Sequence, residues 1–418
     1  MRIAGRKVIC ILLVLLISAL LLGSLGPATA PVARAESLCE PDGQQASGAV
    51  YRICMPPEGE WNGDLVVYAH GYVAYNEPIA IPEDQLSIPD GPSLPEMVNA
   101  MGYAFAVTSY SVNGLAVKEG IADVVDLVEI FSATHGQPRH VYLVGPSEGG
   151  LITALGVERH FDVFDGGLSA CGPVGNFRHQ INYWGDVRVL FDYFFPGVIP
   201  GSPVEIPQEV IDNWDTVYKG RIEAALRADP HATAQLLTVA HVPVDPTDPD
   251  SGIDALMGLL WYNIFATNDG VAKLGGQPYD NHRRLYFGSD DDLRLNLSVA
   301  RFKADPAAIA EIEAHYQTSG DLSVPLVTLH TLGDPIVPYW HELLYRRKIV
   351  VNSDLMLHTN IPSLRYGHCN FSAAEVLLAF AVLVYQVTGE LPDVDQVLTD
   401  APVWDTYRDL APVYGLPH

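Results

Sequence analysis

The fold of this chain is decided by the stretch VYLVGPSEGGLITALG, which runs from Val141 to Gly156. Its first four residues are apolar and predict a short buried strand, and the residues after Gly149 predict a helix. Between them lies Gly145-Pro146-Ser147-Glu148-Gly149, a G-x-S-x-G motif. On a strand-to-helix turn this motif bends the backbone so sharply that only small residues fit around the serine. The Ser147 hydroxyl is therefore expected to stand exposed above a sheet, as a nucleophile does.

The segments on either side predict alternating strands and helices, which is typical of a mostly parallel sheet with helices on both faces. Apolar runs predict strands at 49–55, 64–69, 103–108, 164–170, 324–330 and 355–359. Helical patterns occupy 94–101, 116–134, 339–348 and 372–388. The sheet pattern is absent for about 150 residues in the middle of the chain.

That middle segment predicts a large, mainly helical cap inserted before the strand at 324–330. It is rich in aromatic residues and contains helical patches at 210–226 and 306–318, with a Pro-rich surface loop at 243–250. We therefore expect a catalytic domain formed by 36–173 and 323–418, and a cap or lid formed by 174–322.

A serine hydroxyl is a weak nucleophile unless a base takes its proton and a carboxylate orients that base. Asp334 follows the strand at 324–330, at the sheet edge where such folds place functional groups. His368 lies in a loop before the last helix, within Tyr366-Gly367-His368-Cys369. The order Ser147, Asp334, His368 is the order expected for this architecture. The sequence thus predicts these three residues as a catalytic triad.

Other residues could replace two members of this triad. Asp334 sits in a Gly-Asp-Pro sequence that also suits a plain turn, and an isolated His is often only a hydrogen-bonded residue. Asp321 and Asp354 are the alternative acids. The alternative bases are His330, His341 and His358.

Acyl transfer also needs donors for the oxyanion that forms on the attacked carbonyl. The backbone N–H of Glu148, directly after the serine, is the first predicted donor. The loop Ala69-His70-Gly71-Tyr72 follows an early strand, and the N–H of Tyr72 is the second. The His70 side chain is expected to order this loop rather than to act as a base.

The first 35 residues predict a secretory signal peptide. A basic start precedes an apolar run at 8–22, and Ala33-Arg34-Ala35 suits cleavage after Ala35. Ala28-Thr29-Ala30 is a poorer cleavage site because Pro31 follows it, and an uncleaved membrane anchor is the competing interpretation. Cleavage would leave 383 residues (418 minus 35) and no stable membrane anchor.

The formal net charge is −26, and removal of the four basic residues of the signal segment makes it −30. Such a surface repels phosphate backbones and anionic lipid, so we expect no nucleic-acid partner. Asp245, Asp248, Asp250 and Asp254 could supply calcium oxygens, but their spacing lacks the full loop signature. No His/Cys cluster has zinc spacing and no phosphate-binding loop follows a strand, so no metal or cofactor is expected.

Four cysteines remain after Cys10 leaves with the signal peptide: Cys39, Cys54, Cys171 and Cys369. An even number in a secreted chain predicts two disulfides among three pairings. Cys39 and Cys54 flank a predicted hairpin and should pair, which leaves Cys171 for Cys369. Four unpaired buried thiols are the alternative.

The chain resembles the α/β-hydrolases of the esterase and lipase type over most of 48–173 and 323–418. The motifs that carry this resemblance are His70-Gly71-Tyr72, Gly145 to Gly149, Gly333-Asp334-Pro335 and Gly367-His368. The resemblance implies a serine hydrolase that cleaves small-molecule or polymeric carboxylic esters without a cofactor. A serine peptidase of the same fold and a non-catalytic binding module are the rival interpretations.

His368-Cys369 also resembles the tannase and feruloyl-esterase group, in which cysteines beside the nucleophile and the His are bridged. Pro146 occupies the position before the serine here, so that bridge cannot form, and Cys171 would substitute as the partner. Two aromatic clusters in the cap are expected to pack its core, and a few members could face Ser147 and line an apolar pocket. The clusters are Tyr183, Trp184, Phe191, Tyr193, Phe194 and Phe195, and Trp261, Tyr262 and Phe265.

Overall fold

The computed structural model describes residues 38–87, 93–395, 397–398 and 401–416. The predicted signal peptide, its cleavage after Ala35, and Cys10 lie outside these residues. Within the described ranges, no helix is long and apolar enough to cross a membrane.

One sheet of eight strands forms the centre of the described chain, in the order β1-β2-β4-β3-β5-β6-β7-β8. β1 pairs antiparallel with β2 and β2 pairs antiparallel with β4, whereas every pair from β4 to β8 is parallel. This order confirms the predicted α/β-hydrolase fold. The strands are β1 (Gly43–Gln44), β2 (Val50–Cys54), β3 (Leu65–Tyr68), β4 (Ala104–Thr108), β5 (Val141–Pro146), β6 (Gly166–Ala170), β7 (Leu326–Gly333) and β8 (His358–Tyr366).

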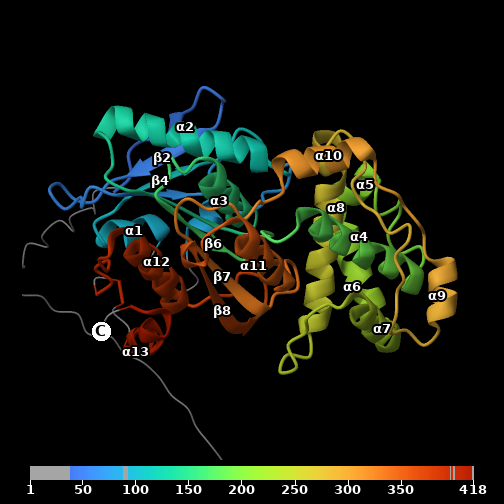
Figure 1. Ribbon diagram of the computed structural model, residues 1–418. Coiled ribbons are helices and arrows are strands. Elements are labelled where there is room, and N and C mark those ends of the chain that lie inside the picture. The colour runs from blue at the N-terminus through green and yellow to red at the C-terminus, as the bar shows by residue number, and fades with distance from the viewer. Residues whose placement is uncertain (1–37, 88–92, 396, 399–400, 417–418) are drawn as a thin grey trace, which may run out of the picture. The chain divides into compact units, whose positions relative to one another are not determined.

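Helices cover both faces of the sheet (Figure 1). On one face α2 (Val117–His135), α3 (Glu148–Arg159) and α11 (Trp340–Asn352) share one apolar core with the strands. On the other face α1 (Leu94–Ala100), α12 (Ala373–Thr388) and α13 (Ala401–Leu410) share a second core. Because both faces are covered, side chains on both sides of the inner strands are buried, as in β3 and β4, where every residue is buried.

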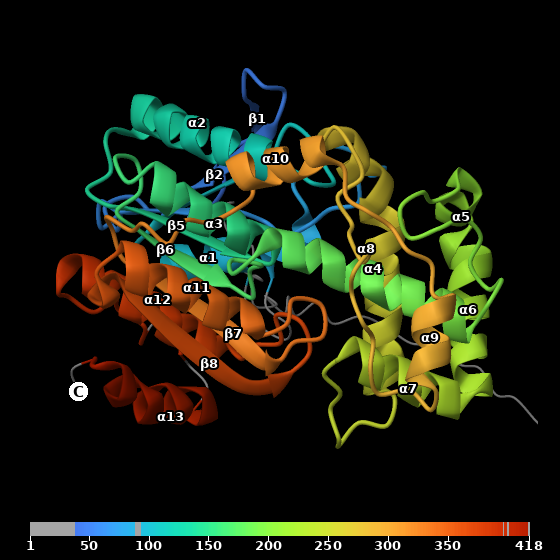
Figure 2. The same ribbon diagram turned by 45° about the vertical axis from the view of Figure 1, so that its right-hand side comes forward.

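The segment between β6 and β7 forms a group of helices beside the sheet (Figure 2). Its members pack around their own apolar core, which includes Leu190, Phe191, Leu256 and Leu260. They are α4 (Phe177–Phe194), α5 (Gln208–Asp212), η2 (Trp214–Tyr218), α6 (Lys219–Ala228), α7 (Pro230–Ala240), α8 (Ser251–Lys273) and α9 (Asp292–Ser298). We call this group the cap.

The last helix of the inserted segment, α10 (Pro306–His315), packs differently from the cap helices. Its Ala308 and Ile312 belong to the core shared by α2 and α3. Lys118 of α2 also places its Nζ 2.6 Å from Glu311 Oε1. The helix therefore belongs, by its packing, with the helices on that face of the sheet.

Two expected elements differ from the structure. The helix expected at 210–226 is divided into α5, the π-helical turn η2, and α6. The strand expected at 355–359 begins later than expected: Leu355–Leu357 form a 3-10 turn capped by the Asp354 side chain, and β8 begins at His358. The strand continues through Pro362, which β8 tolerates because it is an edge strand with only one hydrogen-bonded neighbour.

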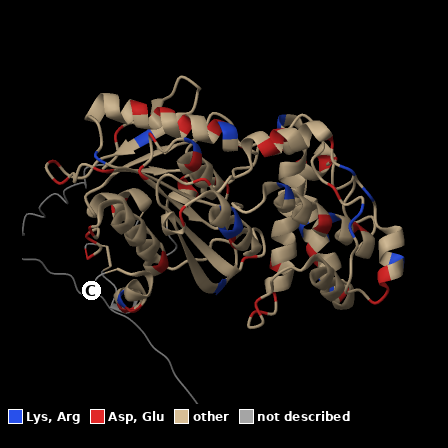
Figure 3. Cartoon of the chain, in the orientation of Figure 1, with Lys and Arg blue, Asp and Glu red and all other residues tan. Residues whose placement is uncertain are grey.

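The remaining helical segments are η1 (Glu83–Leu86), η3 (Leu355–Leu357) and η4 (Ala411–Tyr414). The acidic side chains are distributed over the sheet layers and the cap alike, with Lys and Arg scattered among them (Figure 3). The negative charge is therefore spread over the described surface and is not concentrated at one site.

Candidate active site

Ser147 stands on the turn between β5 and α3, with a positive φ of 55°. Its N–H donates to the carbonyl oxygen of Ala170, 2.8 Å away, which ties the turn to the neighbouring strand β6. A Cβ at Gly145 or Gly149 would overlap the carbonyl oxygen of Ala69. The two glycines are therefore required because the early-strand loop lies directly against the turn.

Ser147, His368 and Asp334 are joined by hydrogen bonds. His368 Nε2 lies 2.9 Å from Ser147 Oγ, and His368 Nδ1 lies 2.7 Å from Asp334 Oδ2. With Nδ1 donating to the carboxylate, Nε2 is the acceptor and can take the serine proton. The structure thus brings the three residues together from loops that are 221 and 34 positions apart.

Asp334 is completely buried at the end of β7. Its Oδ1 accepts hydrogen bonds from the N–H groups of Ile336 and Val337, each 2.9 Å away. Burial alone raises the pKa of this carboxyl, but the imidazoles of His368 and His330 outweigh it and lower the pKa to about 2. Asp334 is therefore ionised over the whole range in which a histidine base works.

His330, one of the alternative bases, lies beneath the triad instead of replacing a member of it. Its Nδ1 is 3.0 Å from Glu342 Oε1, and its Nε2 is 2.7 Å from the carbonyl oxygen of Val337 and 3.6 Å from Asp334 Oδ2. Burial lowers the pKa of His330, but the carboxylates of Asp334 and Glu342 raise it to about 10. Because both ring nitrogens face acceptors, the ring carries both protons and is a buried cation.

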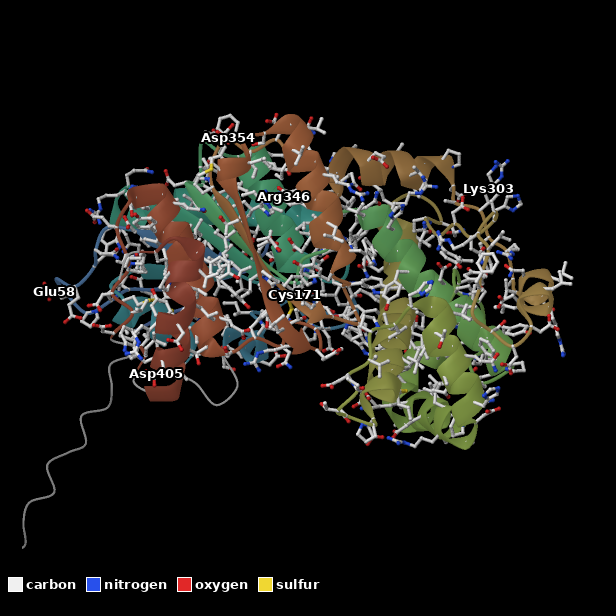
Figure 4. The ribbon with its side chains drawn as sticks, turned by 60° about the horizontal axis from the view of Figure 1, so that its bottom comes forward. Glu58, Cys171, Lys303, Arg346, Asp354 and Asp405 are labelled. Carbon is white, nitrogen blue, oxygen red and sulfur yellow. A yellow bond between two sulfur atoms is a disulfide. The ribbon has the colours of Figure 1, made fainter. Side chains whose placement is uncertain are left out.

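The other alternative residues are engaged elsewhere. His341 accepts from the Gly175 N–H at 3.0 Å and contacts Gln180 Oε1 at 2.7 Å, and His358 contacts Thr328 at 3.2 Å. Asp321 is exposed. Asp354 lies at the opposite end of the strands from Cys171, as Figure 4 shows.

The loop after β3 is held beside Ser147 by Gln85. Gly71 donates its N–H to Gln85 Oε1 at 2.7 Å, and Gln85 Nε2 reaches the Tyr72 carbonyl oxygen at 3.4 Å. Among the described residues, no acceptor is found for the N–H of Tyr72. His70 contacts the Gly71 carbonyl oxygen at 2.7 Å and stacks on Tyr110, so it orders this loop as expected.

Both the backbone and the side chain of Glu148 lie beside the serine. As the first residue of α3, it has a backbone N–H without an acceptor inside the helix. Its side chain is buried, and Oε1 accepts from the Ala116 N–H at 2.9 Å. Burial is the largest effect on this carboxyl and raises its pKa to about 8. Glu148 is therefore uncharged at neutral pH, directly beside the serine.

Both predicted cysteine pairs are disulfide-bonded in the structure, Cys39 to Cys54 and Cys171 to Cys369. The second bond ties the end of β6 to the His368 loop, and Cys369 Sγ lies 3.6 Å from His368 Nε2. Cys171, labelled in Figure 4, lies where the sheet layers meet the cap. With His368, these two cysteines are the group of metal-type ligands found among the described residues, but their sulfurs are bonded to each other.

Three of the four aspartates considered for calcium form turns or an ion pair. Asp245 Oδ1 accepts from the N–H and hydroxyl of Thr247, and Asp248 Oδ1 accepts from the Asp250 N–H. Asp250 pairs with Arg227 at 2.7 Å. The fourth, Asp254, lies in the first turn of α8.

The cap aromatics divide into two sets. Trp184 and Tyr262 stack on each other with ring centroids 4.9 Å apart and line a cavity that Ser147 also lines. Phe191, Phe195 and Phe265 are buried in the cap core. Tyr72 joins the two regions, because its hydroxyl donates to the Phe265 carbonyl oxygen at 3.1 Å.

Sequence reasoning did not identify Gln85 or Glu342 as parts of the site. Gln85 lies in a short 3-10 turn with no motif around it, so no sequence signal marks it. Glu342 follows His330 by 12 residues and reaches it only because α11 folds back on β7. The aromatic cluster of the cap did contain Tyr262, but the spacing could not show which face of the helix meets Ser147.

No protein-family model matches this chain. A stretch of 77 residues is 36% identical to o-phthalyl amidase of Xanthobacter agilis, covering 18% of this chain and 17% of the amidase. An acylaminoacyl peptidase structure aligns with 86% of this chain and 43% of its own, at 14% identity and a TM-score of 0.40. An esterase from Aspergillus oryzae aligns over 83% and 79%, at 14% identity and a TM-score of 0.47. The chain thus spans less than half of the amidase and of the peptidase.

Proposed function

We propose that this chain is a serine hydrolase that cleaves carboxylic esters. The observation that carries the proposal is the hydrogen-bond chain from Asp334 through His368 to Ser147, at 2.7 and 2.9 Å. A buried carboxylate, an imidazole and a serine on a strained turn are the groups that nucleophilic acyl transfer requires.

In the proposed mechanism, His368 Nε2 takes the Ser147 proton as Oγ attacks the ester carbonyl carbon. The N–H groups of Glu148 and Tyr72 hold the oxyanion. The tetrahedral intermediate collapses when His368 returns the proton to the leaving alcohol oxygen, and the acyl group stays on Ser147. Water, deprotonated by the same imidazole, then releases the carboxylic acid and restores the serine hydroxyl.

The lining of the cavity beside Ser147 favours an ester over a peptide with a free amine. Glu148 is the one acidic residue among the described residues that line it, and its carboxyl is uncharged at neutral pH. The cap contributes apolar, aromatic and amide side chains, including Trp184, Tyr262 and Asn263. A substrate ammonium group would therefore find only this one carboxyl, which burial disfavours in its charged form, to replace its lost hydration.

Ser147→Ala is the direct test. It should lower turnover of p-nitrophenyl esters by about a thousandfold or more and abolish labelling by a fluorophosphonate, with an unchanged melting temperature. Activity near that of the unmodified enzyme would remove Ser147 from the mechanism. Faster turnover of aminoacyl anilides than of esters would instead assign the chain to peptide hydrolysis.

We also propose that the chain works in an oxidising compartment outside the cytoplasm, supported by its two disulfides. Fractionation of the producing cells, with sequencing of the N-terminus of the recovered protein, tests this. Recovery of reduced full-length protein from the cytoplasm alone would contradict it.

A further inference from the structure

Two apolar cavities meet at the nucleophile. Both are lined by Tyr72, Ser147 and Tyr262, and they extend from there in different directions. One lies under the cap, and we call it the cap cavity. The other lies between the sheet and helices α1 and α12, and we call it the α12 cavity. A substrate attacked by Ser147 would therefore place one of its two parts in each cavity.

The cap cavity is narrow. Its volume is about 90 Å³, and its walls are mostly apolar side chains, among them Leu151 of α3, Trp184 of α4 and Val271 of α8. For comparison, an apolar cavity of roughly 150 Å³ binds a benzene molecule. The group that enters the cap cavity is therefore small.

The α12 cavity is larger, with a volume of about 380 Å³. Met97 and Val98 of α1 and Leu377 and Phe380 of α12 form one wall, and the strands form the other. These side chains offer no charge and few hydrogen-bonding groups. The cavity therefore suits a bulky apolar group.

The position of His368 decides which part of the ester enters which cavity. His368 and Cys369 line the α12 cavity and do not line the cap cavity. The general acid must reach the leaving alcohol oxygen, because it returns the proton to that atom. The alcohol part therefore lies on the α12 side, which leaves the cap cavity for the acyl part.

We propose that the substrates are esters that join a short acyl group to a bulky apolar alcohol. This inference rests on the proposed ester hydrolysis by Ser147. It adds a substrate class, because the two cavities differ about fourfold in volume, 90 against 380 Å³.

Octyl acetate and ethyl octanoate test the proposal as a matched pair. They are isomers, both release a primary alcohol, and they differ in which side carries the long chain. Each buried methylene contributes about 0.8 kcal/mol, so we expect kcat/KM for octyl acetate to exceed that for ethyl octanoate by about tenfold or more. Equal values, or a preference for ethyl octanoate, would overturn the assignment. Absence of both ethyl acetate hydrolysis and fluorophosphonate labelling would instead refute the serine mechanism, and this inference with it.

Two variants locate the preference in the two cavities. A Cβ at Gly270 meets no atom within 4 Å, so Gly270→Leu fills the cap cavity without a clash at its first carbon. It should lower turnover of ethyl butanoate relative to ethyl acetate. Met97→Trp should lower turnover of octyl acetate relative to ethyl acetate. The reverse pattern would show that the acyl and alcohol sides are exchanged.

Each rate is normalised to the concentration of enzyme that a fluorophosphonate labels, so loss of folded protein does not enter the comparison. If Met97→Trp does not fold, Val98→Phe places a smaller addition on the same wall. An unchanged octyl acetate to ethyl acetate ratio in a folded variant at this wall would contradict occupation of the α12 cavity by the alcohol.

Discussion

The turn that carries Ser147 and helix α8 of the cap differ in how closely they are packed. At Gly149 an added Cβ would overlap the carbonyl oxygen of Ala69, whereas at Gly270 of α8 it would meet nothing within 4 Å. Close packing at the turn fixes the serine against the loop that is proposed to hold the oxyanion. Open space in the cap leaves room for a substrate group. Atomic positions are therefore fixed closely where bonds change and less closely where a substrate group is only accommodated.

The largest effect is expected from a substitution that disrupts the close packing of the Ser147 turn. Gly149→Ala should lower the free energy of unfolding by about 3 kcal/mol or more, because its Cβ meets backbone that cannot move alone. Gly270→Ala is the control and should stabilise α8 by up to about 1 kcal/mol, since alanine is the better helix former. Chemical denaturation measures both. Equal effects would show that the two sites are not packed differently.

The second prediction concerns His330, the buried cation beside Asp334. His330→Gln removes the cation that lies 3.0 Å from the buried Glu342 carboxylate. We therefore expect the free energy of unfolding to fall by about 3 kcal/mol at pH 7. The double variant His330→Gln with Glu342→Gln removes both charges and should lose less than the first variant alone. Urea denaturation of the single and double variants tests this. A double variant that loses the sum of the single losses would show that the two residues are not coupled.

The Glu148 carboxyl makes the stability of the folded protein depend on pH. Burial raises its folded-state pKa from 4.5 to about 8. The stability that this carboxyl contributes is therefore complete below pH 4.5 and is lost as the pH rises through 8. Glu148→Gln removes the loss, so it should melt like the unmodified protein at pH 4 and be more stable by on the order of 3 kcal/mol at pH 9. Equal melting temperatures of the variant and the unmodified protein at both pH values would contradict a buried neutral Glu148.

The smallest effect is expected for the loop of Gly71 and Tyr72, which lies beside Ser147. Gln85→Ala removes the acceptor of the Gly71 N–H, so the Tyr72 N–H should be held less firmly and kcat should fall by about tenfold. KM should change little, because the oxyanion exists only after attack. Gln235→Ala, which removes a hydrogen bond to Asp290 in the cap, is the control and should leave kcat unchanged. A rise in KM alone would assign Gln85 to substrate binding instead.

Much of the sheet could be predicted from the sequence, because its elements have local signatures. The strand, the glycines and the helix around Ser147 lie within one stretch of chain, and parallel strands place the loops of Asp334 and His368 at the same edge. The edge strand β8 was placed too early, since its continuation through Pro362 is acceptable only at an edge. The cap could be predicted as mainly helical, but the break at η2, between α5 and α6, has no comparable signal.

The type of chemistry available follows from the amino-acid sequence: one serine on a glycine-flanked turn, followed by an acid and a histidine in the expected order. The environment of those groups depends on the folded chain. The protonated state of His330, the neutral Glu148 and the unequal cavities arise where distant segments enclose a group and remove water. Sequence spacing cannot report these properties, because charge state and cavity volume depend on what surrounds a side chain in space.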